Sequence, residues 1–238
     1  MSESIQILKD IEKAVMLCDK KYTDTDIWEV LKQKSPEENK QLDIEKQICI
    51  LNLKSIKSQD EADLLVHHLT QHHGLIRETC AQKVNEFFKD PKYQGFFQTK
   101  NISDSLLKAV NDINPNICRL IIEILPLIED KKYFLSNLYE RIEFVFTEIE
   151  KLKRSNFYTK KVFNLYWCLE ALAVLKAPID ERLISVLNRS SKFKDYTIRE
   201  KTAMVLHLLD ESTKETNDIK TFLKNDENFY VKQYSQQW

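Results

Sequence analysis

The sequence predicts an all-α protein made of stacked helical hairpins, and three observations lead to this prediction. The 238 residues include only 2 glycines and 5 prolines, whereas sheets joined by tight turns need more of both. Apolar residues recur at spacings of three and four along most of the chain, which is the period of one helix face. A capped helix start also returns several times. With 42% hydrophobic residues, the chain is long enough to bury a substantial core.

The recurring helix start places a potential N-cap three residues before a β-branched aliphatic residue. The copies pair these cap and aliphatic residues: His73 with Ile76, Asn114 with Ile117, Asp195 with Ile198, and Asn228 with Val231. When an earlier marker at Ile44 is included, the units average about 37 residues, with two helices in each. Because one hairpin cannot bury its apolar stripe alone, we expect successive hairpins to stack and share one core.

The chain is expected to form a single repeat domain over residues 1–238. Its elements are a capping helix at 1–22, followed by hairpins at 23–56, 58–89, 101–128, 130–176, 178–210 and 213–238. In the capping helix, Ile5, Leu8, Ile11 and Val15 lie on one face. This helix would cover the first end of the stack.

The hairpins of the first half are bounded by one strong start signal and one break. Ser35 and Glu38 are spaced as a capping box, in which each side chain satisfies a backbone donor of the other residue. Residues 89–101 contain Pro91 and Gly95 and interrupt the apolar pattern. We predict that this segment is the longest loop.

In the second half, polar caps and one proline set the helix boundaries. Asn114 is expected to cap a helix whose first turn holds a proline, and Pro126 is expected to kink or end that helix. Asp130 precedes the longest run of helical spacing, so the longest helix should start there. The segment Pro178-Ile179-Asp180 should open the next helix, and Asp195 should cap the helix after it.

Composition limits the classes of function. The formal net charge is −1, so no global field favours nucleic acid or an anionic membrane. No segment approaches the ~20 apolar residues of a membrane span, and the N-terminus lacks the apolar core of a signal peptide. The odd number of cysteines, each among apolar residues, predicts reduced core residues and a cytoplasmic protein. These cysteines are Cys18, Cys49, Cys80, Cys118 and Cys168.

The capped starts carry a resemblance to a known repeat family. The segment Asp195–Ala203, D-Y-T-I-R-E-K-T-A, is similar to the second-helix motif of HEAT repeats, and His73–Ala81, H-G-L-I-R-E-T-C-A, matches most of it. The resemblance implies a right-handed α-α superhelix, a HEAT-like solenoid of about six hairpins. We expect the basic residues beside the aliphatic marker, Arg77, Arg199 and Lys232, to bond an acidic or carbonyl group of a neighbouring turn.

Four histidines lie close together in the sequence. His68 and His72 are four residues apart on one helix face, a spacing compatible with a metal ion, and His67 and His73 flank them. No third ligand is specified, because neither a Cys-x-x-Cys nor a His-Glu-x-x-His motif accompanies them. We therefore interpret them as surface or interface histidines, with His73 as a turn or cap residue, and assign no metal.

A cluster of positive charge surrounds one predicted helix turn. It consists of Lys151, Lys153, Arg154, Lys160 and Lys161. Such a cluster could hold a phosphate or an acidic peptide. The interpretation that we prefer is a solvated hairpin end.

One enzyme family remains as an alternative. HEAT-like DNA alkylation repair glycosylases have a similar length, and in that family tryptophans and an aspartate line the nucleotide cleft. Here Trp28, Trp167 and Trp238 are isolated from one another, so the resemblance transfers no catalytic residue. Two lone glycines also exclude phosphate-cradling glycine loops and nucleophile elbows.

The sequence thus predicts a non-enzymatic scaffold or adaptor that binds another protein and needs no cofactor. The binding surface should be the face formed by the second helices of the hairpins. Its exposed positions are expected to be Glu78, Gln82, Arg119, Glu123, Asn164, Glu200 and Lys201. A nucleic-acid-binding relative of the repair glycosylases is the alternative, and no membrane is expected to be bound. The aromatic C-terminal helix, with Tyr230, Tyr234 and Trp238, could also meet a partner or a second copy.

Overall fold

The computed structural model describes residues 3–10, 36–71, 73–152, 156–209 and 211–235, and within these ranges the protein is all-helical with no strand. The expected all-α class is confirmed. The chain divides into two compact units, Met1–Ser105 and Leu106–Trp238. No described helix is both long enough and apolar enough to cross a lipid bilayer. The arrangement as one repeat domain stays a prediction.

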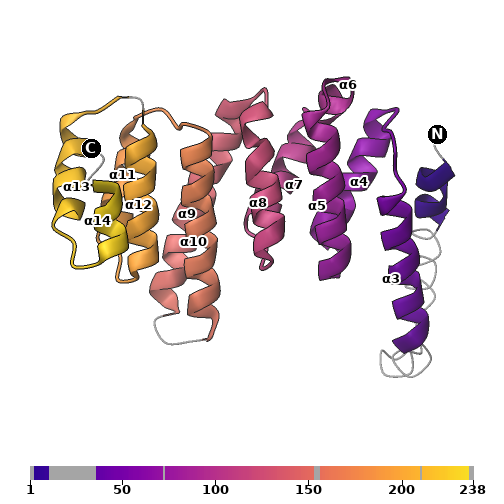
Figure 1. Cartoon of the computed structure of the whole chain (residues 1–238), viewed down its shortest axis with the longest axis horizontal. Helices are drawn as coiled ribbons and strands as arrows, with labels where there is room; N and C mark the ends of the chain where they lie inside the picture. Colours follow the sequence, from indigo (N-terminus) through magenta and orange to yellow (C-terminus); the bar gives the residue numbers. More distant parts are fainter. Residues whose placement is uncertain (1–2, 11–35, 72, 153–155, 210, 236–238) are drawn as a thin grey trace. The chain divides into compact units, whose positions relative to one another are not determined.

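The first unit packs three main helices and a short helical connection. Residues 3–10 are helical, and they are followed by α3 (Pro36–Leu51), α4 (Gln59–Gln71) and α5 (Gly74–Lys89). Helix α5 packs against both α3 and α4 (Figure 1). The large side chains that fill this core include Leu65, Leu69, Ile76, Phe87 and Phe88. The expected Ser35–Glu38 capping box and most of the capping helix at 1–22 lie outside the described residues.

The segment predicted to be the longest loop is helical, so that prediction was wrong. It contains α6 (Pro91–Gln94) and a 3-10 turn, η1 (Gly95–Phe97). The Asp90 side chain accepts a hydrogen bond from the Lys92 backbone N–H at 2.9 Å, and Pro91 occupies the first turn. Tyr93 and Phe97 are buried, so tertiary packing and a cap stabilise a segment in which Pro91 and Gly95 suggested a break. Helix α7 (Lys100–Val110) follows and contains the boundary between the units.

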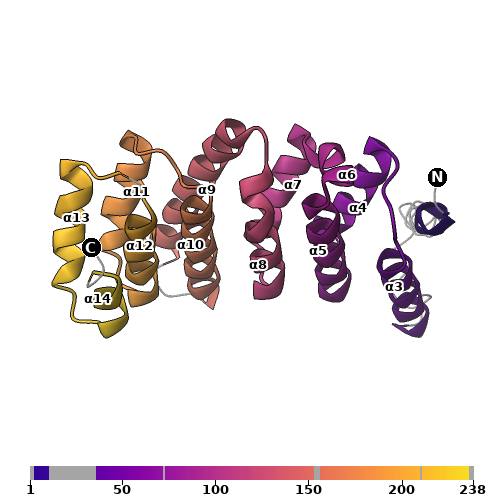
Figure 2. The same cartoon turned by 45° about the horizontal axis from the view of Figure 1, so that its top comes forward.

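The second unit consists mainly of helical hairpins. After α8 (Pro115–Ile124) and the turn η2 (Leu125–Leu127), the hairpins pair α9 (Lys131–Lys151) with α10 (Asn156–Val174), α11 (Glu181–Ser191) with α12 (Tyr196–Leu208), and α13 (Lys214–Lys224) with α14 (Phe229–Ser235). The second helices pack in the order α8, α10, α12 and α14, and α11 packs against α13 (Figures 1 and 2). Each hairpin therefore buries its apolar side against the next one.

Polar side chains start the helices of the second unit where the sequence placed them. The carboxylates of Asp130, Asp180 and Asp195 and the amide oxygen of Asn114 each accept a hydrogen bond from a backbone N–H in the first turn. Helix α8 ends before Pro126, as expected from the lost backbone donor. With 21 residues, α9 is the longest of the helices whose bounds the structure gives. These predictions are confirmed.

Two other helix starts differ in part from expectation. His73 occupies the N-cap position of α5, as expected for a turn or cap residue, but its side chain forms no capping hydrogen bond. Thr213 and Thr216 form a reciprocal capping box at the start of α13, with bonds of 2.8 and 3.3 Å. This box was not predicted, because threonine replaces the usual glutamate at the third helical position.

Candidate protein-binding groove

An open groove of about 670 Å³ lies over the second helices α8, α10 and α12 of the second unit, and we call it the α10 groove. Its lining residues come from all three helices and from the cap of α12: Pro115, Arg119, Thr159, Val162, Phe163, Tyr166, Trp167, Glu170, Asp195, Thr197 and Lys201. Since α10 packs between α8 and α12, it supplies the floor and its neighbours supply the two rims.

The floor is one face of α10. Residues from Thr159 to Glu170 line the groove at steps of three and four, so they form a single stripe about 16 Å long at 1.5 Å per residue. The Trp167 ring makes edge contacts with the rings of Phe163, at 5.7 Å between centroids, and Tyr166, at 5.1 Å. Trp167 is buried, whereas the other two rings are half-buried. The floor therefore presents fixed, partly exposed aromatic surface.

One rim carries an ion pair that is already satisfied. The Lys201 ammonium donates a short hydrogen bond to the Glu170 carboxylate, and it lies 4.6 Å from the centroid of the Tyr166 ring. Burial, the largest single influence, would lower the pKa of Lys201, but the hydrogen bond and charge of Glu170, together with Tyr166, outweigh it and raise the pKa. Lys201 is therefore charged at neutral pH, and its charge is neutralised by Glu170.

The other rim carries a free cation. Arg119, on α8, is exposed and forms no ion pair or cation–π contact with any residue in the part of the chain that the structure describes. Of the remaining charged residues in the lining, Asp195 accepts hydrogen bonds from the backbone N–H of Thr197 at 3.0 Å and from its hydroxyl at 2.8 Å. The α10 groove thus combines an aromatic floor with Arg119, a cation that has no ion-pair partner among the described residues, and with Asp195, whose carboxylate is held by neutral donors of the α12 start.

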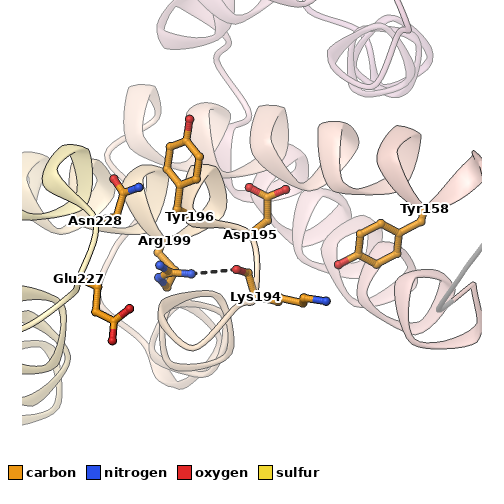
Figure 3. Close-up of a pocket in the computed structure, with 7 residues that line it drawn as sticks. All are labelled: Tyr158, Lys194, Asp195, Tyr196, Arg199, Glu227 and Asn228. Carbon is orange, nitrogen blue, oxygen red and sulfur yellow. Dashed lines mark hydrogen bonds between the residues drawn. The ribbon is translucent and has the colours of Figure 1, made fainter.

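A second open pocket, of about 1050 Å³, lies at the starts of α12 and α14 (Figure 3). Its lining residues are Tyr158, Lys194, Asp195, Tyr196, Arg199, Glu227 and Asn228. Arg199 Nη1 donates to the carbonyl oxygens of Phe193 at 2.8 Å and Lys194 at 3.0 Å, and Asn228 Oδ1 accepts from the Tyr230 N–H at 2.9 Å. Arg199, Asp195 and Asn228 are therefore already engaged at the starts of α12 and α14.

The residues predicted for the binding surface lie in different surroundings. Arg119 and Lys201 line the α10 groove, and Glu123 and Glu200 lie on α8 and α12 outside its lining, exposed and half-buried respectively. Glu78 and Gln82 belong to α5 of the first unit. Whether these six residues contact a partner stays a prediction.

Asn164 was expected to be exposed, and this prediction was wrong. Its side chain is buried, and its Nδ2 donates a hydrogen bond to the Asn111 carbonyl oxygen at 2.9 Å. The same Asn111 accepts from Cys168 Sγ through its side-chain oxygen at 3.4 Å. Asn164 therefore fastens α10 to the end of α7 and is not available to a partner.

The aromatic floor of the groove was not predicted from the sequence. Helical spacing places Phe163, Tyr166 and Trp167 on neighbouring positions of α10, but it does not show that part of this surface stays uncovered. The available signal was the continuation of their stripe into polar Thr159 and Glu170 at helical spacing. A stripe with polar ends is typical of a face that is only partly covered.

The histidine cluster divides between the core and the surface of the first unit. His68 is fully buried, His67 is half-buried, His73 is exposed, and His72 lies outside the described residues. The interpretation of His68 as a surface residue was therefore wrong. Among the described residues, no group of three or more potential ligands is placed to hold a metal ion.

In the basic cluster, Lys151 and Lys161 are partly neutralised by one carboxylate. Lys151 Nζ lies 3.4 Å from one carboxylate oxygen of Glu148, and Lys161 Nζ lies 4.0 Å from the other. Lys161 also lies 5.2 Å from the centroid of the Phe144 ring. Lys153 and Arg154 lie outside the described residues, so anion binding by this cluster stays an untested alternative.

Four of the five cysteines are described, and they are buried and free. Cys18 lies outside the described residues. Burial raises the pKa of the Cys168 thiol to about 12, so this thiol is protonated and unreactive at neutral pH. The expected core position is confirmed for Cys49, Cys80, Cys118 and Cys168, while their reduced state stays a prediction.

Comparison with known proteins does not place the chain in a family. No family model matches it, and no curated protein has a matching sequence. Crystal structures of two engineered proteins from the Northeast Structural Genomics Consortium resemble it, with 11% and 13% identity and TM-scores of 0.49 and 0.45. Each match covers 100% of this chain, and it covers 97% of the first engineered protein and 95% of the second. Because both TM-scores are below 0.5, neither structure is used to assign a fold or a function.

Proposed function

We propose that this protein is a non-enzymatic scaffold that binds another protein through the surface of its second helices, α8, α10 and α12. In this proposal the stacked hairpins belong to a right-handed, HEAT-like solenoid. Neither a catalytic residue nor a cofactor is assigned. The observation that carries the proposal is the α10 groove, because it combines aromatic surface with charged rims on one face.

The groove has the composition that protein interfaces favour. Tyrosine, tryptophan, phenylalanine and arginine are the residue types enriched at interface centres, and Tyr166, Trp167, Phe163 and Arg119 all line this one groove. Helix α10 is packed against both α8 and α12, so little conformational entropy is lost when a partner binds.

The alternative function is nucleic-acid binding, and the charges of the α10 groove do not favour it. Phosphate recognition relies on several cations along the path of the strand. In the α10 groove, Glu170 neutralises Lys201, and Asp195 adds a further negative charge beside the rim. Arg119 alone remains for a phosphate, which favours a protein partner of mixed polarity over a polyanion.

Affinity capture combined with footprinting tests the proposal. The tagged chain is used to capture partners from cells of the native source, and hydrogen exchange of the purified complex locates the contact. We expect slower exchange in α8, α10 and α12 and no change in α9, α11 and α13. The variant Arg119→Glu/Glu123→Arg, which exchanges two exposed charges within α8, should lose the partner.

A matched exchange on a first helix serves as the control. Lys214 and Asp218 are exposed on α13 with the same spacing of four residues, so Lys214→Glu/Asp218→Lys should retain the partner. Protection confined to the first helices would refute the proposal. So would steeply salt-dependent retention of the purified chain on DNA together with release of alkylated bases, which would establish the repair-enzyme alternative.

A further inference from the structure

Three features of the α10 groove specify what part of a partner it can take: its length, its volume and its charge. The lining stripe on α10 extends for about 16 Å, which is the length of about five residues of extended chain at 3.3 Å each. A helix of the same length is about 10 Å across and would occupy roughly 1,300 Å³. The open groove has a volume of about 670 Å³, so a helix would lie on the groove with one face against it, whereas an extended segment can lie largely inside it.

The charge of the groove selects the chemistry of that segment. Two of its charges, on Lys201 and Glu170, neutralise each other, and Asp195 is engaged by the start of α12. Arg119 is the lining ion without a partner among the described residues. Its neighbour one turn along α8, Glu123, makes no ion pair with it. A guanidinium in this position is complementary to a carboxylate, which it can bind in a bidentate way.

The aromatic floor adds a second requirement. Phe163 and Tyr166 are half-buried, so part of each ring faces the groove. An apolar side chain that covered these rings would remove their remaining surface from water. The lysine ammonium over Tyr166 is occupied by Glu170, so it does not compete for the carboxylate of a ligand.

We infer that the α10 groove binds an extended segment of a partner protein, about five residues long, in which a carboxylate pairs with Arg119 and a nearby apolar side chain covers Phe163 and Tyr166. This inference rests on the proposed scaffold function and specifies its ligand. Arg119 therefore selects a negatively charged residue in the bound segment, and the aromatic floor of α10 selects an apolar residue close to it. Glu170 and Lys201 act as a fixed wall of the groove.

Selection from a displayed library of random seven-residue linear peptides on the purified full chain tests the inference. We expect the enriched peptides to carry Asp or Glu within two residues of Leu, Ile or Phe. A labelled enriched peptide, measured by fluorescence anisotropy at pH 7, should bind Arg119→Glu about tenfold more weakly, as expected for a hydrogen bond to a charged group. Replacing the apolar peptide residue by serine should also weaken binding to the unmodified chain.

Exchanging the charges of Arg119 and of the acidic peptide residue tests whether these two groups contact each other. The peptide with Lys in place of its acidic residue should bind Arg119→Glu better than it binds the unmodified chain, and Lys214→Glu on α13 should bind the original peptide normally. Absence of any enriched peptide, enriched peptides without an acidic residue, or equal binding by Arg119→Glu would each overturn the inference. The scaffold proposal fails separately, if the captured partner leaves α8, α10 and α12 unprotected.

Discussion

Arg199 donates two hydrogen bonds to the carboxylate of Asp226, from Nε to Oδ2 at 2.6 Å and from Nη2 to Oδ1 at 3.1 Å. Its remaining nitrogen, Nη1, donates to the carbonyl oxygens of Phe193 and Lys194. The same carboxylate accepts the backbone N–H of Asn228 at 2.8 Å. One guanidinium thus joins the start of α12 to the turn before α14, across two successive hairpins.

Removing this guanidinium should destabilise the stack. We expect Arg199→Met to lower the free energy of unfolding by about 2 kcal/mol, because the partly buried Asp226 and two carbonyl groups lose their donor. Arg199→Lys should recover only part of the loss, since an ammonium cannot form the two parallel bonds. Urea denaturation measures the difference.

The control is Lys151→Met, which removes a cation from an exposed pair with Glu148. Such pairs contribute little, so the cost should stay below about 0.5 kcal/mol. Equal losses for Arg199→Met and Lys151→Met would mean that the Arg199–Asp226 pair is no stronger than an ordinary surface contact.

The same pair predicts a pH dependence. Burial, the largest single influence, would raise the pKa of Asp226, but hydrogen bonds from Arg199 and the Asn228 N–H, with the charges of Arg199 and Lys232, outweigh it and lower the pKa. The unfolded value is about 3.9. A folded pKa below it stabilises the protein above about pH 3.9, and this contribution is lost as the pH falls through the folded pKa.

Comparison of the unmodified chain with Asp226→Asn between pH 3 and 7 tests this dependence. The difference in free energy of unfolding should be constant above about pH 5 and shrink below about pH 4. A difference that stays constant down to pH 3 would show that the carboxylate charge does not contribute to the pair.

The role of Arg199 was predictable because it depends on local sequence. The spacing from Asp195 to Arg199 identifies the start of a second helix, and a basic residue one position after the buried aliphatic lies beside the neighbouring turn. Arg199 confirms the expectation. The charge of Lys232 contributes to the lowered pKa of Asp226, while the expected structural role of Arg77 stays a prediction. Capped starts and apolar spacing likewise placed the helices of the second unit.

The sequence could not reveal features that depend on which helices meet. Periodicity assigns Asn164 to a helix face, but only the packing of α10 brings it to the Asn111 carbonyl, 53 positions earlier in the chain. The α10 groove likewise needs three helices, of which α8 and α12 contribute Arg119 and Lys201 from distant positions. Residues 89–101 were predicted to be a loop because Pro91 and Gly95 interrupt the apolar pattern, but a cap and buried aromatic side chains stabilise helical turns there.

The buried position of Asn164 predicts a loss of stability and not of binding. Asn164→Ala should lower the free energy of unfolding by about 1–2 kcal/mol, since the Asn111 carbonyl loses its donor. The exposed Asn188 on α11 is the control, and Asn188→Ala should cost less than about 0.5 kcal/mol. Partner binding by Asn164→Ala should be unchanged below its melting temperature. Weaker partner binding at unchanged stability would show that Asn164 does contact the partner.

The two kinds of helix start provide another comparison. Asp130 accepts a hydrogen bond from the Tyr133 N–H at 2.9 Å, so Asp130→Ala should cost about 1 kcal/mol. His73 makes no capping bond, so His73→Ala should change stability by less than about 0.3 kcal/mol, whereas His73→Asp should add about 0.5–1 kcal/mol. Urea denaturation measures all three variants. A cost for His73→Ala equal to that of Asp130→Ala would show that the histidine does cap α5.

The end of α10 offers a stabilising substitution. Lys176 has φ of 49°, in the left-handed region where a Cβ atom is unfavourable. Its N–H donates to the Ala173 carbonyl oxygen at 3.0 Å and the Ala177 N–H donates to that of Leu172 at 3.1 Å, the pattern of a Schellman motif, which favours glycine. Lys176→Gly should therefore raise the free energy of unfolding by about 0.5–1 kcal/mol, after the greater freedom of glycine in the unfolded chain is subtracted.

The matched control for this substitution is Lys176→Ala, which shortens the side chain but keeps the Cβ atom. It should give no gain, so a higher urea midpoint for Lys176→Gly alone would assign the effect to the backbone. If both variants are destabilised equally, the contacts of the Lys176 side chain outweigh the backbone strain, and the end of α10 is held by the lysine itself.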